Sequence, residues 1–229
     1  MNARHAAAAI AATILLVIPV SGIAQPPPEM SDLKLVKSKN LDQVYLLPGT
    51  DFGAYKKVML DPAQVSFNKS WMKDTRSADL TARRGIAPEQ AKQIADLARS
   101  SVGDVFQDSF KRAGYEIVTA SGPDVVRITP AVINLYINAP SGGTATRTYA
   151  VSAGEATLVL AVRDSVSGAL LGMALDKRET RTAMAGPVLA DGVTNRAEFE
   201  VLFRRWADIA ARGFTALKEQ KAPAPAKGK

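Results

Sequence analysis

The polar segment 68–84 carries the side chains best suited to hold a ligand. Trp71 lies there among basic residues, which are Lys69, Lys73, Arg76, Arg83 and Arg84. A guanidinium group beside an indole can bind an acidic glycan, a lipid head group or an anionic protein surface through charge-assisted hydrogen bonds and ring stacking. The candidate binding residues are therefore Trp71, Arg76, Arg83 and Arg84. The alternative interpretation is a solvated loop whose tryptophan covers the edge of a sheet.

Two further polar clusters offer weaker chemistry. The stretch Ser141-Gly142-Gly143-Thr144 is rich in glycine, but a phosphate cradle needs such glycines to lead from a strand into a helix, and a strand is expected to follow here. In the charged run 176–181, Asp176 and Arg178 share one face of a strand. Most such runs form a solvated face with weak ion pairs.

The composition argues against most enzyme chemistry. The chain has no cysteine, and its one histidine, His5, lies in the expected leader. Imidazole proton relays, thiolate nucleophiles and Zn(Cys/His) sites are therefore excluded from the exported part. A carboxylate pair for glycosidase chemistry has four candidates, Glu155, Asp164, Asp176 and Glu179, but nothing in the sequence sets any two at the required separation. We predict no catalytic residue, no metal and no cofactor.

The N-terminus has the pattern of a cleavable signal peptide, residues 1–24. Arg4 and His5 precede an apolar run over 6–20, and small residues lead to a cleavage site after Ala24. The run is short against the roughly 20 residues that span a bilayer, although a retained N-terminal anchor is the alternative. No cysteine stands at the cleavage site to carry a lipid. We expect a periplasmic protein with at most peripheral membrane association.

The rest of the chain divides into three parts. Residues 25–40 open with three prolines and read as a Pro-rich spacer, and residues 218–229 form a basic tail of alanine, proline and lysine. A single domain is expected over 41–217. The formal net charge is +7, but much of it lies in the leader and the tail, so nucleic-acid binding is not supported.

Hydrophobic periodicity predicts two long helices within this domain. One runs from Pro88 to Gly114, with an apolar stripe that includes Ile94, Leu97, Val102 and Phe106. The other begins at Asn195, which forms a capping box with Glu198, and its stripe includes Phe199, Phe203, Trp206 and Leu217.

Alternating patterns predict the strands. The first covers 56–61, and Val65 and Phe67 continue it past Pro62. A short strand over 115–118 and a long one over 125–138 follow, the long one with a bulge near Thr129 and Pro130. Residues 155–164 and 171–175 form a hairpin around Gly168.

These elements predict an α/β fold, an α+β sandwich. A mostly antiparallel sheet of about five strands carries the two long helices on one face, and the first helix crosses over between parallel strands. The other face would show Thr157, Val159, Ala161 and Arg163, whose mixed character suits a modest partner interface.

Three local stretches in this order resemble a bacterial family of exported proteins: residues 55–62 (YKKVMLDP), 164–168 (DSVSG) and 205–208 (RWAD). Over roughly 41–217 the chain is similar to the domain of unknown function 3313 family. Members often look like lipoproteins with a cysteine after the leader, and this chain departs from that pattern. The resemblance implies an envelope location and an α/β fold, and it supplies no catalytic residues.

Together these observations predict a non-catalytic, envelope-associated interaction module that binds an envelope protein or an anionic surface polymer. A small-ligand or glycan-binding periplasmic protein is the second hypothesis, which a deep polar pocket would favour. A hydrolase that uses carboxylates alone is the third, and it requires two facing carboxylates with opposed pKa shifts. The sequence does not determine the oligomeric state.

Overall fold

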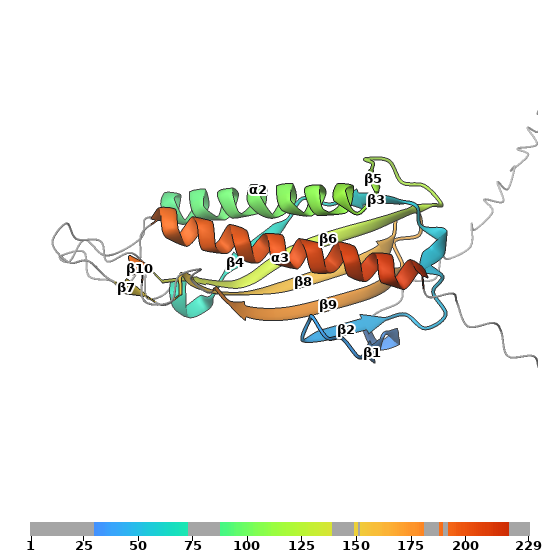
Figure 1. Ribbon diagram of the computed structural model, residues 1–229, viewed down its shortest axis with the longest axis horizontal. Helices are drawn as coiled ribbons and strands as arrows, with labels where there is room; N and C mark the ends of the chain where they lie inside the picture. Colours follow the sequence, from blue (N-terminus) through green and yellow to red (C-terminus); the bar gives the residue numbers. More distant parts are fainter. Residues whose placement is uncertain are drawn as a thin grey trace, which may run out of the picture.

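The computed structural model describes residues 30–72, 88–138, 149–150, 152–180, 188–189 and 192–219. Its main feature is a mixed sheet with two long helices along one face (Figure 1). The helices are α2 (Pro88–Arg112) and α3 (Gly192–Glu219). The eight strands of the sheet are β1 (Lys34–Val36), β2 (Gln43–Leu46), β3 (Lys57–Leu60), β4 (Gln64–Phe67), β5 (Glu116–Ile117), β6 (Val125–Ile137), β8 (Gly154–Asp164) and β9 (Leu170–Glu179). Strands β7 (Tyr149–Ala150) and β10 (Val188–Leu189) form a separate pair.

The α/β class predicted from the sequence holds, but the sheet is larger and less antiparallel than expected. Its order is β1-β2-β9-β8-β6-β3-β5, and β4 also pairs with β6. The expected count of about five strands is wrong because β1, β2 and β4 add to it. Strand β3 pairs in parallel with β5 and with β6, since α2 crosses over between them. The meander β6-β8-β9 is antiparallel, as expected.

The segment 25–40, expected to be a spacer, contributes to the sheet from its second half. Leu33 is buried, and β1 pairs with β2, which pairs in turn with β9. Three or four residues per strand are too few to show a period of their own, so the pattern could not reveal them.

Pro62 interrupts the first predicted strand as expected. Strands β3 and β4 lie on either side of it, and both pair in parallel with β6. Between them, the Asp61 carboxylate accepts hydrogen bonds from the Arg127 guanidinium at 2.8 Å and from the Thr129 hydroxyl. A proline cannot donate to the ladder, so the break falls where the chain lacks an N–H group.

The bulge in β6 lies further along than predicted. Burial alternates through Val126, Ile128, Pro130 and Val132, so Thr129 and Pro130 fit the ladder without a bulge. The register shifts instead between Ile133 and Tyr136, where Asn134 adopts a φ of 52°. Asparagine tolerates this left-handed conformation better than most residues, which explains why the shift occurs there.

The two helices run side by side in the same direction over the sheet (Figure 1). The Ser109 hydroxyl donates to Asp208 at 2.6 Å, and one to two turns later the hydroxyls of Tyr115 and Thr215 lie 3.0 Å apart. Helix α2 matches its prediction, and Gly114 with a φ of 88° ends it. Its first half is less buried than expected, since Leu97 is largely exposed.

The start of α3 differs from the predicted capping box. The helix begins at Gly192, so Asn195 and Glu198 lie inside it. Their side chains bind the end of the sheet instead: the Asn195 amide donates to the Asn138 carbonyl at 2.9 Å, and Glu198 accepts from the Ala153 N–H at 2.8 Å. These side chains dock the helix rather than cap it.

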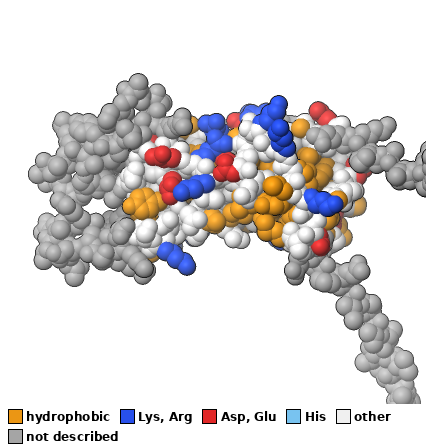
Figure 2. Space-filling view, turned by 90° about the horizontal axis from the view of Figure 1, so that it is seen from below, with side chains coloured by type: hydrophobic (Ala, Val, Ile, Leu, Met, Phe, Trp, Pro, Cys, Tyr) orange, Lys and Arg blue, Asp and Glu red, His pale blue; other side chains and the backbone are white. Residues whose placement is uncertain are grey.

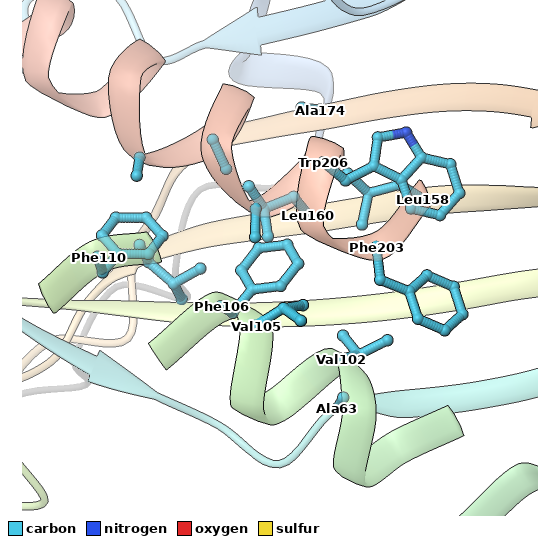
Figure 3. Close-up of a cluster of buried hydrophobic side chains, with 14 of the residues drawn as sticks. Ala63, Val102, Val105, Phe106, Phe110, Leu158, Leu160, Ala174, Phe203 and Trp206 are labelled. Carbon is cyan, nitrogen blue, oxygen red and sulfur yellow. The ribbon is translucent and has the colours of Figure 1, made fainter. Parts of the chain in front are cut away.

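The core lies between the helices and one face of the sheet. Figure 3 shows Phe106, Phe110, Phe203 and Trp206 from the helices against Leu158, Leu160 and Ala174 from β8 and β9. Of these side chains, Trp206, Phe110 and Leu158 have no accessible surface. Each large apolar side chain buried in this way contributes roughly 1.5–3 kcal/mol to stability.

Replacing Trp206 by alanine tests whether α3 is integral to the domain. We expect Trp206→Ala to lower the free energy of unfolding by about 3–5 kcal/mol, because it leaves a cavity in a packed core. Val201→Ala on the exposed side of the same helix is the control and should stay within about 0.5 kcal/mol of the parent. Urea denaturation measures both, and equal effects would show that the helix is not docked.

Candidate functional site

Trp71, the predicted aromatic binding residue, is a packed side chain in the structure. Only 2% of its surface is accessible, its indole N–H donates to the Ile137 carbonyl at 2.8 Å, and its ring stacks on Phe67 with centroids 4.3 Å apart. This placement fits the alternative interpretation, in which the tryptophan covers the edge of the sheet. Arg76, Arg83 and Arg84 lie outside the described residues, so their binding role stays a prediction.

The charged run at the end of β9 contains a buried anion, contrary to the solvated face expected there. Asp176 is 1% exposed and faces α3. Its carboxylate accepts hydrogen bonds from the Trp206 indole at 2.7 Å, from the Asp42 N–H at 3.0 Å and from the Arg178 guanidinium. The bond to Trp206 joins the sheet to α3, and the bond to Asp42 joins β9 to the turn before β2.

The turn before β2 also accepts hydrogen bonds from residues of β9. The Asp42 carboxylate accepts from the Lys177 N–H at 2.9 Å, and the Arg178 guanidinium donates to the Asn40 carbonyl at 2.7 Å. The hydrogen bonds from Trp206 and Asp42 to Asp176 thus join β9 to α3 and to the turn before β2. A carboxylate so engaged is an anchor of the fold rather than a general acid or base.

Asp164 is the next carboxylate considered for hydrolysis, and it also serves a turn. It accepts from the Tyr55 hydroxyl at 3.0 Å and from the N–H groups of Val166 and Ser167. Partial burial tends to raise the pKa of Asp164, but the hydrogen bonds from Ser167, Tyr55 and Val166 outweigh it and lower the pKa. Burial and the bond to Asp164 raise the pKa of Tyr55 to about 12. The pKa of each group is thus shifted further from 7, so neither side chain is suited to transfer a proton at neutral pH.

A metal centre receives no support from the described part of the chain. No three His, Asp or Glu side chains gather there in a way that could hold an ion.

An apolar cavity that the sequence analysis did not identify lies between α3 and the β1-β2-β9 side of the sheet. Its volume is about 430 Å³, within the range of small-molecule sites. Small residues are part of its lining: Gly172 and Ala174 on β9, and Ala210 and Gly213 on α3. We call this space the α3 cavity. The small residues of β9 and α3 are the sequence feature that could have indicated the cavity. They are far apart in the sequence, so the feature cannot be recognised before it is known that α3 packs on β9.

The opposite face of the sheet carries no described helix. Register places Thr157, Val159, Ala161 and Arg163 there, as predicted, and all four are half-buried. Met173 and Leu175 of β9 and Ala131 of β6 lie beside them as cross-strand neighbours. We call this surface the free face. Figure 2 views the molecule from the side on which β1 and β2 lie, and hydrophobic side chains gather there on the right half of the described surface.

The family model for proteins of unknown function called DUF3313 matches residues 20–209. The chain belongs to the DUF3313 family. The resemblance seen in the three short stretches is thereby confirmed, although the match begins earlier than the expected domain and ends before Leu217. Among curated proteins, none matches this sequence.

Solved structures resemble this DUF3313 protein only distantly. The PelC dodecamer from Paraburkholderia phytofirmans is 10% identical, with a TM-score of 0.36 and coverage of 72% of this chain and 96% of that one. Protein XCC0632 from Xanthomonas campestris, of the DUF330 family, is 12% identical, with a TM-score of 0.36 and coverage of 76% and 88%. These values are too low for the function of either protein to be transferred. No helix in the described ranges has the length and apolar character to cross a bilayer.

The contact of Asp208 with α2 predicts a pH-dependent stability. Hydrogen bonds from Ser109 at 2.6 Å and from Arg112 at 2.8 Å outweigh its partial burial and lower the pKa of Asp208 below its usual 3.8. A lowered folded-state pKa means that the ionised form stabilises the fold at neutral pH, and that this contribution is lost as the pH falls below about 4. Asp208→Asn should therefore show a smaller loss of stability than the parent between about pH 5 and pH 2.

Urea denaturation at each pH measures this difference. Asp104→Asn on the exposed side of α2 is the matched control and should follow the parent curve. If Asp208→Asn kept the full acid sensitivity of the parent, the contact with Ser109 and Arg112 would contribute nothing to stability.

Proposed function

We propose that this DUF3313 protein is a non-catalytic binding module of the bacterial envelope that contacts a partner protein through the free face. The observation that carries the proposal is a stretch of half-buried apolar and small side chains on the central strands, on the face that α2 and α3 leave uncovered. A contiguous apolar patch on a protein surface is typical of a site that binds another protein. The proposed location rests on the signal-peptide pattern of residues 1–24.

The shape of the free face favours a protein over a small ligand. Val159, Ala161 and their neighbours on β6 and β9 stand on adjacent strands of a pleated surface, and small-molecule sites are concave. Aliphatic side chains in the centre with charges at the margin are typical of a protein interface. Arg163 and Arg127 are cross-strand neighbours at one end, so the partner should place an acidic side chain opposite Arg163.

The known carboxylate contacts argue against the hydrolase hypothesis. Asp176 is bound by Trp206, Asp42 and Arg178, while Asp164 is bound by Tyr55 and its own turn. Asp176 shares a polar pocket with Asp42, Glu179 and Glu198, but the hydrogen bonds that it accepts already hold it in the fold, whereas glycosidase chemistry requires two carboxylates free to act on a substrate. Binding without catalysis is the function that this arrangement supports best.

Site-specific photo-crosslinking in living cells tests the proposal. A photoreactive residue at Val159 should give one dominant adduct with another envelope protein, and the same residue at Gln107, on the exposed side of α2, should not. Mass spectrometry identifies the adduct, and a photoreactive residue placed on the identified partner should capture this chain in return. Equal yields at the two positions would show that the free face is not an interface.

A charge placed on the free face provides the second arm of this test. Val159→Glu should abolish the adduct formed from a photoreactive residue at Met173, because an acid replaces an apolar contact at the centre of the face. Adducts that form only with a second copy of this chain would contradict the proposed partner and assign the face to self-association.

A further inference from the structure

The α3 cavity has the properties of a ligand site that is separate from the free face. We propose that it binds a single acyl chain that ends in an anionic head group. The site lies on the helix side of the sheet, so this inference does not depend on the proposed function.

The depth of the cavity suits an aliphatic chain. Its lining reaches inward to Ile128, Leu160 and Phe110, each of which is almost fully buried. Val44 and Leu46 of β2 form one side of it, toward the edge of the sheet. A space of about 430 Å³ with this lining has few polar groups to bind water, and burial of a methylene group is worth about 0.8 kcal/mol. An alkyl chain is therefore favoured over a sugar or a nucleotide.

The charge around the cavity is positive. No Asp or Glu is among the residues that line it, whereas Lys37 and Arg212 do so, and both are exposed. Lys37 precedes Ser38 and Asn40, which also line the cavity and supply polar groups at its margin. A carboxylate or phosphate head group can bind the two cations while the alkyl chain lies among the aliphatic side chains.

Glycine and alanine hold the space between α3 and the sheet open. A Cβ atom added at Gly213 would have no atom within 4 Å, so this residue borders open space. Phe214 next to it packs instead against Phe52 with centroids 6.1 Å apart. Gly213 is exposed, so it lies at the open side of the cavity, where a larger side chain would have room to enter.

The C-terminal tail of the chain is a poor occupant. Residues 220–229 read QKAPAPAKGK, with three lysines and with alanine and proline as the only apolar side chains. Insertion of this tail would place its lysines near Lys37 and Arg212, and like charges repel. An anionic amphiphile meets both the apolar lining and the cationic margin.

Calorimetric titration of the purified, delipidated full chain tests the inference with two amphiphiles of equal chain length. Dodecanoate should bind at one site per chain, and dodecyltrimethylammonium should bind about tenfold more weakly or not at all, because its head group is cationic. Absence of dodecanoate binding, or equal affinity for the two amphiphiles, would overturn the proposal.

Two pairs of variants locate the site. Gly213→Leu should weaken dodecanoate binding by about tenfold or more, while leucine raises rather than lowers helix stability relative to glycine. Gly103→Leu in α2, where an added Cβ also meets open space, is the control and should bind as the parent does. Lys37→Glu should weaken binding, and Lys39→Glu, with the same charge change at a residue that does not line the cavity, should not.

Two results would overturn the assignment of the site even if dodecanoate bound. One is parent-like affinity in both Gly213→Leu and Lys37→Glu. The other is binding by a chain that ends at Glu219 but not by the full chain, because this would assign the cavity to residues 220–229.

Discussion

A single buried carboxylate sets how α3 lies on the sheet. Taking an ionised group out of water costs several kcal/mol unless hydrogen bonds compensate for it. Asp176 receives such bonds from the Trp206 indole, the Asp42 N–H and the Arg178 guanidinium, which belong to α3, the turn before β2 and β9. These donors satisfy the anion only when the three elements lie in one arrangement. The apolar core supplies most of the stability, while this polar contact specifies the position of the helix and of the edge strands.

The two proposed binding surfaces both follow from that arrangement. The indole of Trp206 ties the middle of α3 to β9, and further along the helix the small residues Ala210 and Gly213 line a space together with Gly172 and Ala174 of β9. Space remains between them, and it forms the α3 cavity. Both long helices lie on the same face, so the opposite face of the central strands keeps its half-buried aliphatic side chains. One sheet thus has a cavity on its helix side and the free face on the other side.

The sequence predicts the elements whose patterns are long. Helix α2, the β8–β9 hairpin with Gly168 and the break at Pro62 follow from periodicity and turn chemistry that a local window contains. The sequence does not reveal that Asp176 is buried, because its neighbours Lys177, Arg178 and Glu179 suggest solvent, while two of its hydrogen-bond donors lie 30 and 134 residues away. The α3 cavity could not be predicted either, because the small residues that line it belong to β9 and α3, which are far apart in the sequence. In the candidate binding loop, composition identified Trp71 but could not show that Phe67 and Ile137 engage its ring.

A double-mutant cycle between Trp206 and Asp176 tests most directly whether the buried carboxylate ties the helix to the sheet. The free energy of unfolding would be measured by urea denaturation for the parent, Trp206→Phe, Asp176→Ala and the double variant. The account predicts a coupling energy of about 1.5–3 kcal/mol, the range for a hydrogen bond to a charged group. Additive effects of the two substitutions, within about 0.5 kcal/mol, would contradict it.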